Sequence, residues 1–110
     1  MEVHKHLGNG FQEVIYQRAL EIELGLSSLE FKREFKMPIM YKGQQIGTRR
    51  VDFLINGNIS VEMKAVTQTE PVHLAQALNY LEVYNLEVGL LINFGAQSLQ
   101  VKRLLNKKKV

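Results

Sequence analysis

The sequence predicts a mixed α/β (α+β) protein of element order α-β-β-β-α-β, with a mixed central sheet flanked by helices. Apolar residues alternate along 51–55 and again along 59–65, as in two hairpin strands that bury one face. Apolar residues recur at helical spacing along 11–24 and 71–84. The run 88–94 is almost continuously apolar, which is typical of a strand buried on both faces. A crossover through the second helix would make that strand parallel to its neighbour.

The N-terminal part of the chain predicts a short helix and a long one. Residues 2–7 are expected to be helical up to the glycines at 8 and 10, and the chain is expected to lack part of an initial helix. The long helix runs from Phe11 to Leu24 and stops at Gly25. We expect the following apolar stripe to face the core: Phe11, Val14, Ile15, Ala19, Ile22 and Leu26. An adjoining stripe consists of Glu13, Gln17, Leu20 and Leu24.

The strands come next. Residues 29–36 are compatible with either a strand or irregular chain, and 37–41 form a strand that Pro38 assigns to an edge of the sheet. Lys42-Gly43-Gln44 indicates a hairpin turn, followed by strands over 45–55 and 59–66.

The C-terminal part predicts a helix and one or two strands. Thr69 is the expected cap of a helix that has Pro71 in its first turn and ends near Tyr84. Its expected core face is Val72, Ala75, Leu78, Asn79 and Val83. After the strand 88–94, residues 99–105 form either a strand, which we favour, or a short helix, and 106–110 form a basic tail.

Length and composition limit the classes of protein. With 110 residues the chain is expected to form a single domain, 1–110, and 45% hydrophobic and 23% charged residues are ordinary for a globular protein. The absence of cysteine excludes disulfides and thiolate sites. No apolar run approaches the ~18 residues of a membrane span, so we expect a cytoplasmic protein without membrane contact. A net charge of +3 mildly favours polyanionic partners.

The connection between the central strands determines which residues meet. A two-residue loop would pair Asp52 with Val61 and set a polar face against an apolar one. A three-residue loop, in which Gly57 or Asn58 supplies a positive φ, pairs Ile55 with Ile59, Phe53 with Val61 and Asp52 with Glu62. This register sets two carboxylates side by side, with Lys64 one pleat away. Like charges directly opposite destabilise a sheet, and a bound cation is one candidate for compensation.

Such a hairpin suggests phosphodiester chemistry. Two carboxylates make an oxygen site suited to Mg²⁺ or Mn²⁺, which can activate water and screen charge on a phosphoryl group. The Lys64 ammonium would stabilise the transition state or position the attacking water. Arg50 is expected opposite Lys64, and two adjacent cations suit a phosphate site. The alternative is a solvated hairpin face with surface ion pairs worth ~0–1 kcal/mol.

Four motifs in order resemble a known family. They are Gly10-Phe11-Gln12-Glu13-Val14-Ile15-Tyr16; Val51-Asp52 followed by Glu62-Met63-Lys64; residues 71–81, with Gln76 and Tyr80 four apart; and residues 89–94. The sequence resembles the PD-(D/E)xK nuclease superfamily and, within it, the small GxxExxY proteins, along nearly the whole chain. Val51 stands where the superfamily motif has proline.

The resemblance implies a restriction-endonuclease-like fold and Mg²⁺- or Mn²⁺-dependent cleavage of nucleic acid, with DNA favoured over RNA. It implies catalysis by Asp52, Glu62 and Lys64. The implied metal ligands are Glu13, Asp52, Glu62 and the backbone carbonyl of Met63. Gln76 and Tyr80, with Arg50 from the register above, are the expected substrate contacts. His73 is expected to be structural or to support the residues that bind the metal, and Tyr16 is expected to pack.

Two other functions remain open from the sequence. The same fold can bind nucleic acid or a protein without catalysis. The edge strand at Pro38 and the small size also suit a self-associating subunit.

Overall fold

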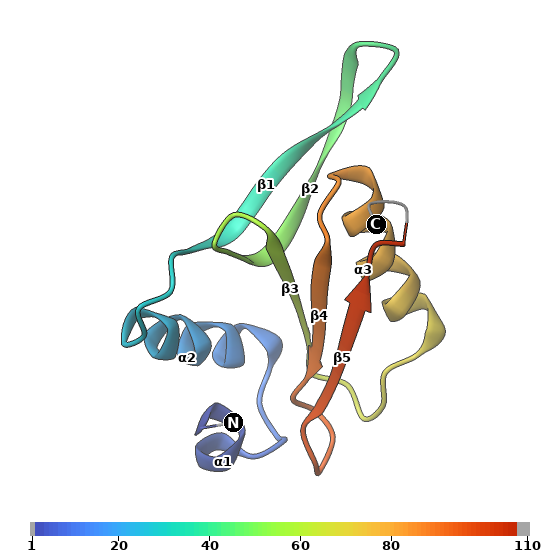
Figure 1. Ribbon diagram of the computed structural model, residues 1–110. Coiled ribbons are helices and arrows are strands. Elements are labelled where there is room, and N and C mark those ends of the chain that lie inside the picture. Colours follow the sequence, from blue (N-terminus) through green and yellow to red (C-terminus); the bar gives the residue numbers. More distant parts are fainter. Residues whose placement is uncertain (1, 108–110) are drawn as a thin grey trace.

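The computed structural model describes residues 2–107 and confirms the predicted fold class (Figure 1). Its five strands form one sheet in the order β1-β2-β3-β4-β5, in which β3 and β4 are parallel and all other neighbours are antiparallel. The element bounds are α1 Glu2–Leu7, α2 Glu13–Gly25, β1 Phe31–Tyr41, β2 Gln44–Ile55, β3 Ile59–Lys64, α3 Pro71–Val83, β4 Val88–Asn93 and β5 Gln100–Leu105.

The two long helices cover opposite faces of the sheet (Figure 1). On the α2 face, Tyr16 is completely buried and stacks on Phe94 with ring centroids 4.7 Å apart, against Phe53 and Met63 of the same cluster. On the α3 face, Tyr80 packs in a second cluster with Val51 and Leu54. This three-layer arrangement buries both faces of the central strands, as the apolar run of β4 predicts.

The β2–β3 turn has the predicted register. Ile55 pairs with Ile59 and Phe53 with Val61, as in the three-residue loop, but the expected pair Asp52–Glu62 does not form because the ladder ends at Phe53–Val61. The positive φ values lie at Asn56 (53°) and Gly57 (73°). The expectation for Gly57 is therefore confirmed, and Asn56 adopts the second left-handed conformation in place of Asn58.

The first hairpin is longer than the sequence indicated. β1 begins at Phe31, so most of the ambiguous segment 29–36 is strand, and β1 is an edge strand as Pro38 predicted. Lys42 and Gly43 form its turn, with φ values of 49° and 78°. Since β2 pairs with β3 only from Phe53 to Ile55, the rest of the hairpin projects beyond the sheet (Figure 1).

The predicted alternation of β2 fails at Asp52. Val51 and Phe53 were expected on one face, yet Val51 packs with Tyr80 and Phe53 packs with the α2 cluster. The backbone of β1 explains the change. The neighbours of Glu34 on β1 pair with the neighbours of Asp52 on β2, and Glu34 itself has a φ of +53°. The faces of the hairpin therefore exchange at the position of the predicted site.

Both helices bury other residues than expected. In α2 the buried residues are Tyr16, Gln17, Leu20 and Leu24, whereas Ile22 is 65% exposed. In α3 they are Ala77, Tyr80 and Leu81, whereas Val72 and Val83 are exposed. The adjoining stripe of α2 thus faces the sheet. Gln17, which belongs to this stripe, can be buried because polar partners satisfy its side-chain amide.

The N-terminus of α3 differs in one residue. Glu70, not Thr69, is the N-cap, and its backbone N–H donates to His73 Nδ1 at 3.0 Å. Pro71 occupies the first turn as predicted. His73 therefore has the structural role expected of it.

The C-terminal strand is confirmed, and the predicted tail begins later. β5 pairs antiparallel with β4, and Asn106 is buried, with its side-chain amide donating to the Leu81 carbonyl at 3.1 Å. Asn106 is therefore part of the folded domain, and residues 108–110 lie outside the described residues. Within residues 2–107 no helix is long and apolar enough to cross a membrane.

Candidate active site

The candidate site lies where β2 and β3 separate. Their ladder ends at the pair Phe53–Val61, so Asp52 and Glu62 are the next residue on each strand. A cleft of about 280 Å³ opens there between the strands and α2. Its lining residues are Glu13, Val14 and Gln17 from α2, Glu34 from β1, Arg50 and Asp52 from β2, and Met63 from β3.

The Asp52 carboxylate is fixed at both oxygens. Its Oδ2 accepts the backbone N–H of Met63 at 2.7 Å, which ties it to β3, and its Oδ1 accepts Gln17 Nε2 at 3.1 Å. Burial raises the pKa of Asp52, and the Met63 hydrogen bond and the Arg50 cation oppose that shift. The carboxylate is thus oriented before any ligand binds.

Arg33 determines the orientation of the Gln17 side-chain amide. Arg33 donates from Nη2 at 2.7 Å and from Nε at 3.2 Å to Gln17 Oε1, and from Nη1 at 3.3 Å to Glu21. Because a guanidinium only donates, the Gln17 oxygen must face Arg33 and its NH₂ must face Asp52. Sequence reasoning missed this role, although Gln17 lies one helical turn after Glu13 and so on the same face.

Glu62 is the most perturbed carboxyl group of the site. Burial, with repulsion from Asp52, raises its pKa to about 7, while the cations of Arg49 and Lys64 oppose the shift. Its Oε1 is buried and has no hydrogen-bond partner among residues 2–107. Glu62 is half-buried as a whole, and this one oxygen is shielded from solvent.

Lys64 and Glu13 complete the acidic part of the site. The Lys64 ammonium lowers the pKa of Glu13, Asp52 and Glu62, so it acts electrostatically on all three. Glu13 is on the rim of the cleft at the first turn of α2, and burial raises its pKa. Electrostatic interactions thus connect Lys64 with all three acids, whereas only Glu13 and Asp52 of these four residues line the cleft.

The two α3 residues differ in position. The Tyr80 ring is completely buried, its hydroxyl has no described hydrogen-bond partner, and burial raises its pKa to about 12. The Gln76 side chain is exposed, and its backbone carbonyl accepts Arg49 Nη2 at 2.6 Å. Arg49 also donates to Asn79 at 2.8 Å, and its guanidinium carbon lies 5.6 Å from the centre of the Tyr80 ring. Sequence reasoning did not identify Arg49 as the residue that joins β2 to α3.

Arg50 does not pair with Lys64 as expected, because the β2–β3 ladder ends before it. Its partner in the sheet is Lys36 of β1, and its Nη1 lies 3.5 Å from a Glu34 oxygen. It nevertheless lines the cleft beside Asp52. The predicted pairing of Arg50 with Lys64 is therefore wrong.

The donor set fits a hard divalent cation held by two carboxylates. Asp52 accepts one hydrogen bond on each oxygen, and Glu62 Oε1 accepts none from the described residues. No cluster of three or more His, Cys, Asp or Glu side chains able to hold a metal ion occurs in residues 2–107. Magnesium commonly uses only one or two protein carboxylates, with water and substrate oxygens completing its shell.

A larger cleft of about 500 Å³ lies elsewhere, between Leu29–Lys32 and the β2–β3 turn at Asn56 and Gly57. None of the predicted site residues lines it, and its chemistry provides no paired carboxylates. The smaller cleft is lined by four of the predicted site residues, Glu13, Arg50, Asp52 and Met63, the last of which is the backbone neighbour of Glu62.

Comparison with known proteins agrees with this fold. The fold is similar to that in the crystal structure of SSO0001, with a TM-score of 0.67 and 20% sequence identity over 84% of this chain. The chain spans half the length of that protein chain. No curated protein matches the sequence at a significant level. The family model of the PD-(D/E)XK nuclease superfamily matches residues 1–104. The protein therefore belongs to the PD-(D/E)XK nuclease superfamily.

Proposed function

We propose that the protein is a metal-dependent phosphodiester hydrolase that cleaves nucleic acid, with DNA favoured over RNA. The observation that carries this proposal is the buried, unpartnered Glu62 oxygen beside the oriented carboxylate of Asp52. Two half-buried acids with raised pKa values that repel each other are unfavourable together unless a cation lies between them. Superfamily membership supports the same chemistry.

Each residue has a role in this proposal. Asp52 and Glu62 hold Mg²⁺ or Mn²⁺, with the Met63 carbonyl and Glu13 as further ligands, directly or through water. When bound, the ion polarises a phosphoryl oxygen and makes its water a better nucleophile. The Lys64 ammonium stabilises the negative charge that develops on the phosphoryl oxygens.

The remaining residues position the substrate. The exposed Gln76 side chain contacts a phosphate, the buried Tyr80 hydroxyl contacts the ion's water, and Arg50 contacts a phosphate at the mouth of the cleft. Arg33 and Gln17 hold the Asp52 carboxylate in one orientation, which restricts the ligand geometry before the ion binds.

Within the superfamily we assign the chain to the GxxExxY proteins. In this motif Tyr16 has a defined structural task, because its hydroxyl donates to the Gly8 carbonyl at 2.6 Å and accepts the Phe11 N–H at 3.1 Å. The motif tyrosine thereby holds the turn that places Glu13 at the rim of the cleft. The cytoplasm stays the predicted location, since a cysteine-free chain suits a reducing compartment.

Cleavage assays test the proposal. Purified protein with Mn²⁺ or Mg²⁺ is expected to cut linear or circular DNA, and EDTA is expected to stop it. Lys64→Ala and Asp52→Ala are expected to abolish cleavage, whereas Lys102→Ala, at an exposed position on β5, keeps it. Cleavage that survives both site substitutions unchanged would refute the assignment. DNA binding without cleavage or divalent-ion affinity would instead favour the binding module, and sedimentation tests the self-associating subunit.

A further inference from the structure

The hairpin of β1 and β2 forms an arm, which we define as residues 36–50. Along these residues β2 is not paired with β3, so the arm consists of two paired strands without a third neighbour. Figure 1 shows it projecting past the rest of the molecule. All residues from Met40 to Ile46 are exposed.

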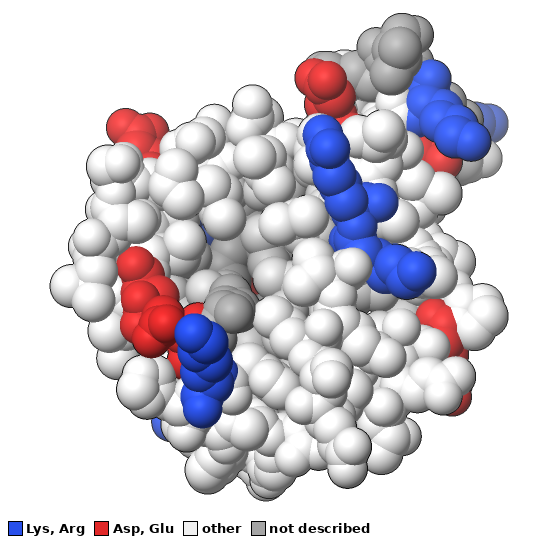
Figure 2. All heavy atoms as spheres, turned by 60° about the horizontal axis from the view of Figure 1, so that its bottom comes forward, with Lys and Arg blue, Asp and Glu red and all other residues white. Residues whose placement is uncertain are grey.

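All charged residues of the arm are basic. Residues 36–50 include Lys36, Lys42, Arg49 and Arg50 and no acidic residue. Lys36 and Arg50 are direct partners in the β1–β2 ladder, an arrangement that destabilises a sheet unless an anion lies nearby. Glu34 is 3.5 Å from Arg50, and Lys36 forms no ion pair within residues 2–107. By contrast, the face in Figure 2 carries small groups of both signs.

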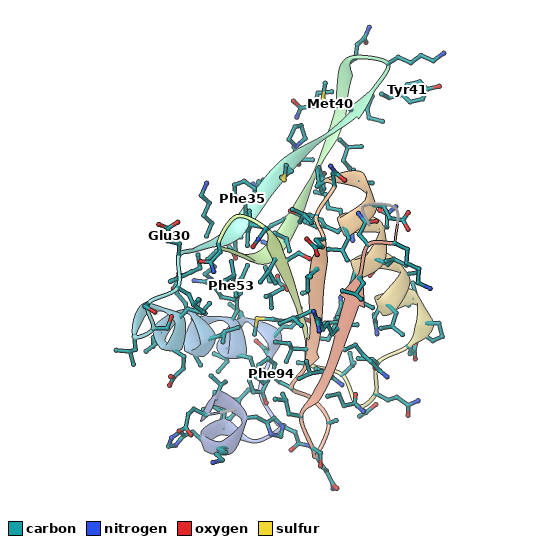
Figure 3. The ribbon with its side chains drawn as sticks, in the orientation of Figure 1. Glu30, Phe35, Met40, Tyr41, Phe53 and Phe94 are labelled. Carbon is teal, nitrogen blue, oxygen red and sulfur yellow. The ribbon has the colours of Figure 1, made fainter. Side chains whose placement is uncertain are left out.

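The tip of the arm combines apolar surface with a cation. Met40, Tyr41 and Ile46 are 54%, 61% and 67% exposed. Figure 3 shows Met40 and Tyr41 at the far end of the arm, remote from the core residues Phe53 and Phe94. The Lys42 ammonium lies 5.5 Å from the centre of the Tyr41 ring. An aromatic ring beside a lysine can contact bases or sugars while the ammonium contacts a phosphate.

The arm begins at the candidate site, because Arg50 lines the same cleft as Asp52. From Lys36 to Lys42 the strand extends roughly 20 Å, at about 3.3 Å per residue. That length corresponds to roughly six base pairs along a duplex. A two-stranded ribbon is narrow enough to enter the major groove.

We infer that the arm binds the nucleic-acid duplex beside the cleaved phosphate, with Lys36 and Lys42 on phosphates and Tyr41 in a groove. The inference rests on the proposed function for its substrate class. A second copy of the chain is disfavoured as the occupant, because two arms of equal charge repel each other.

The test is binding of wild-type protein to a fluorescent DNA duplex in EDTA, measured by anisotropy at several salt concentrations. The double variant Lys36→Gln/Lys42→Gln is expected to lower the slope of log Kd against log salt by about 2, one for each lost phosphate contact. The control Lys102→Gln/Arg103→Gln makes the same charge change on β5, at the opposite edge of the sheet, and is expected to leave the slope unchanged. Tyr41→Ala removes an uncharged contact with the groove and is expected to raise Kd without changing the slope.

Equal slopes for the arm and control variants would overturn the inference. Loss of a sedimenting dimer in the arm variant, with duplex binding intact, would also overturn it and assign the arm to contact between copies. The inference about the arm and the proposed activity can be refuted independently. Cleavage that does not depend on the arm refutes the inference alone, whereas binding that depends on the arm without cleavage in Mn²⁺ refutes the proposed activity alone.

Discussion

The perturbed carboxyl group of Glu62 makes a measurable prediction about stability. Burial raises its pKa from the usual 4.5 to about 7 in the folded protein. The substitution Glu62→Gln replaces the carboxylate by a neutral group of nearly the same shape. It therefore removes the charge that the folded protein disfavours and leaves the packing almost unchanged.

Proton binding determines whether the free energy of unfolding rises or falls with pH. Between its unfolded and folded pKa values, Glu62 is protonated in the folded protein and ionised in the unfolded chain. The free energy of unfolding must therefore fall as the pH rises through this interval. At ~1.4 kcal/mol per pKa unit, the loss is on the order of 3 kcal/mol across the whole interval.

Urea denaturation at about pH 5 and about pH 8 measures this loss. From about pH 5 to about pH 8 the wild-type protein is expected to lose about 2 to 3 kcal/mol more than Glu62→Gln. Glu23→Gln, at an exposed position on α2, is the matched control and is expected to follow the wild type. At the higher pH, Mn²⁺ is expected to stabilise the wild type more than Glu62→Gln, because it binds the folded state through this carboxylate.

Two results would refute the reasoning. If Glu62→Gln and the wild type lose the same stability between the two pH values, the Glu62 carboxyl group is not held in its protonated form by burial. If Mn²⁺ stabilises both proteins equally, the ion does not bind at Glu62.

Three further substitutions test the site and its support. Gln17→Ala removes the donor to Asp52 and is expected to weaken Mn²⁺ binding about tenfold in a calorimetric titration; an unchanged Kd would contradict the positioning role. Tyr16→Phe loses the hydroxyl's two backbone hydrogen bonds and is expected to destabilise the fold by about 1–3 kcal/mol in urea, whereas a loss near zero would show that the turn holds without them. Gly95→Ala sets a methyl group onto the backbone of the segment after β3 and is expected to lower stability by about 2 kcal/mol or more. Gly47→Ala, where the methyl group has ordinary contacts, is its control, and equal Tm values for the two would disprove the close approach.

The sequence predicted the strands and their register because these depend on local patterns. Alternation along 59–65 and the small β2–β3 turn allowed one register that kept apolar faces together, and the structure has it. Pro38 correctly predicted an edge strand, and the crossover through the second helix correctly predicted that β4 has a parallel neighbour. These features need no knowledge of distant contacts.

The buried faces of the helices were predicted less well. The periodicity of α2 fits two overlapping stripes, and the more apolar one, with Phe11 and Ile22, is the exposed one. The choice depends on what the opposing sheet provides. Here Arg33 and Asp52 satisfy the amide of Gln17, which makes its burial favourable.

The sequence by itself determined that Asp52, Glu62 and Lys64 lie on adjacent strands, because alternation and loop length are local properties of the chain. Only the tertiary structure decided how these groups are held. The exchange of faces beside Glu34 directs Asp52 toward Gln17, and Glu62 interacts electrostatically with Tyr80 of α3. Burial, orientation and pKa depend on atoms far apart in the sequence, because the low-dielectric surroundings of a carboxylate form only when sheet and helices pack together.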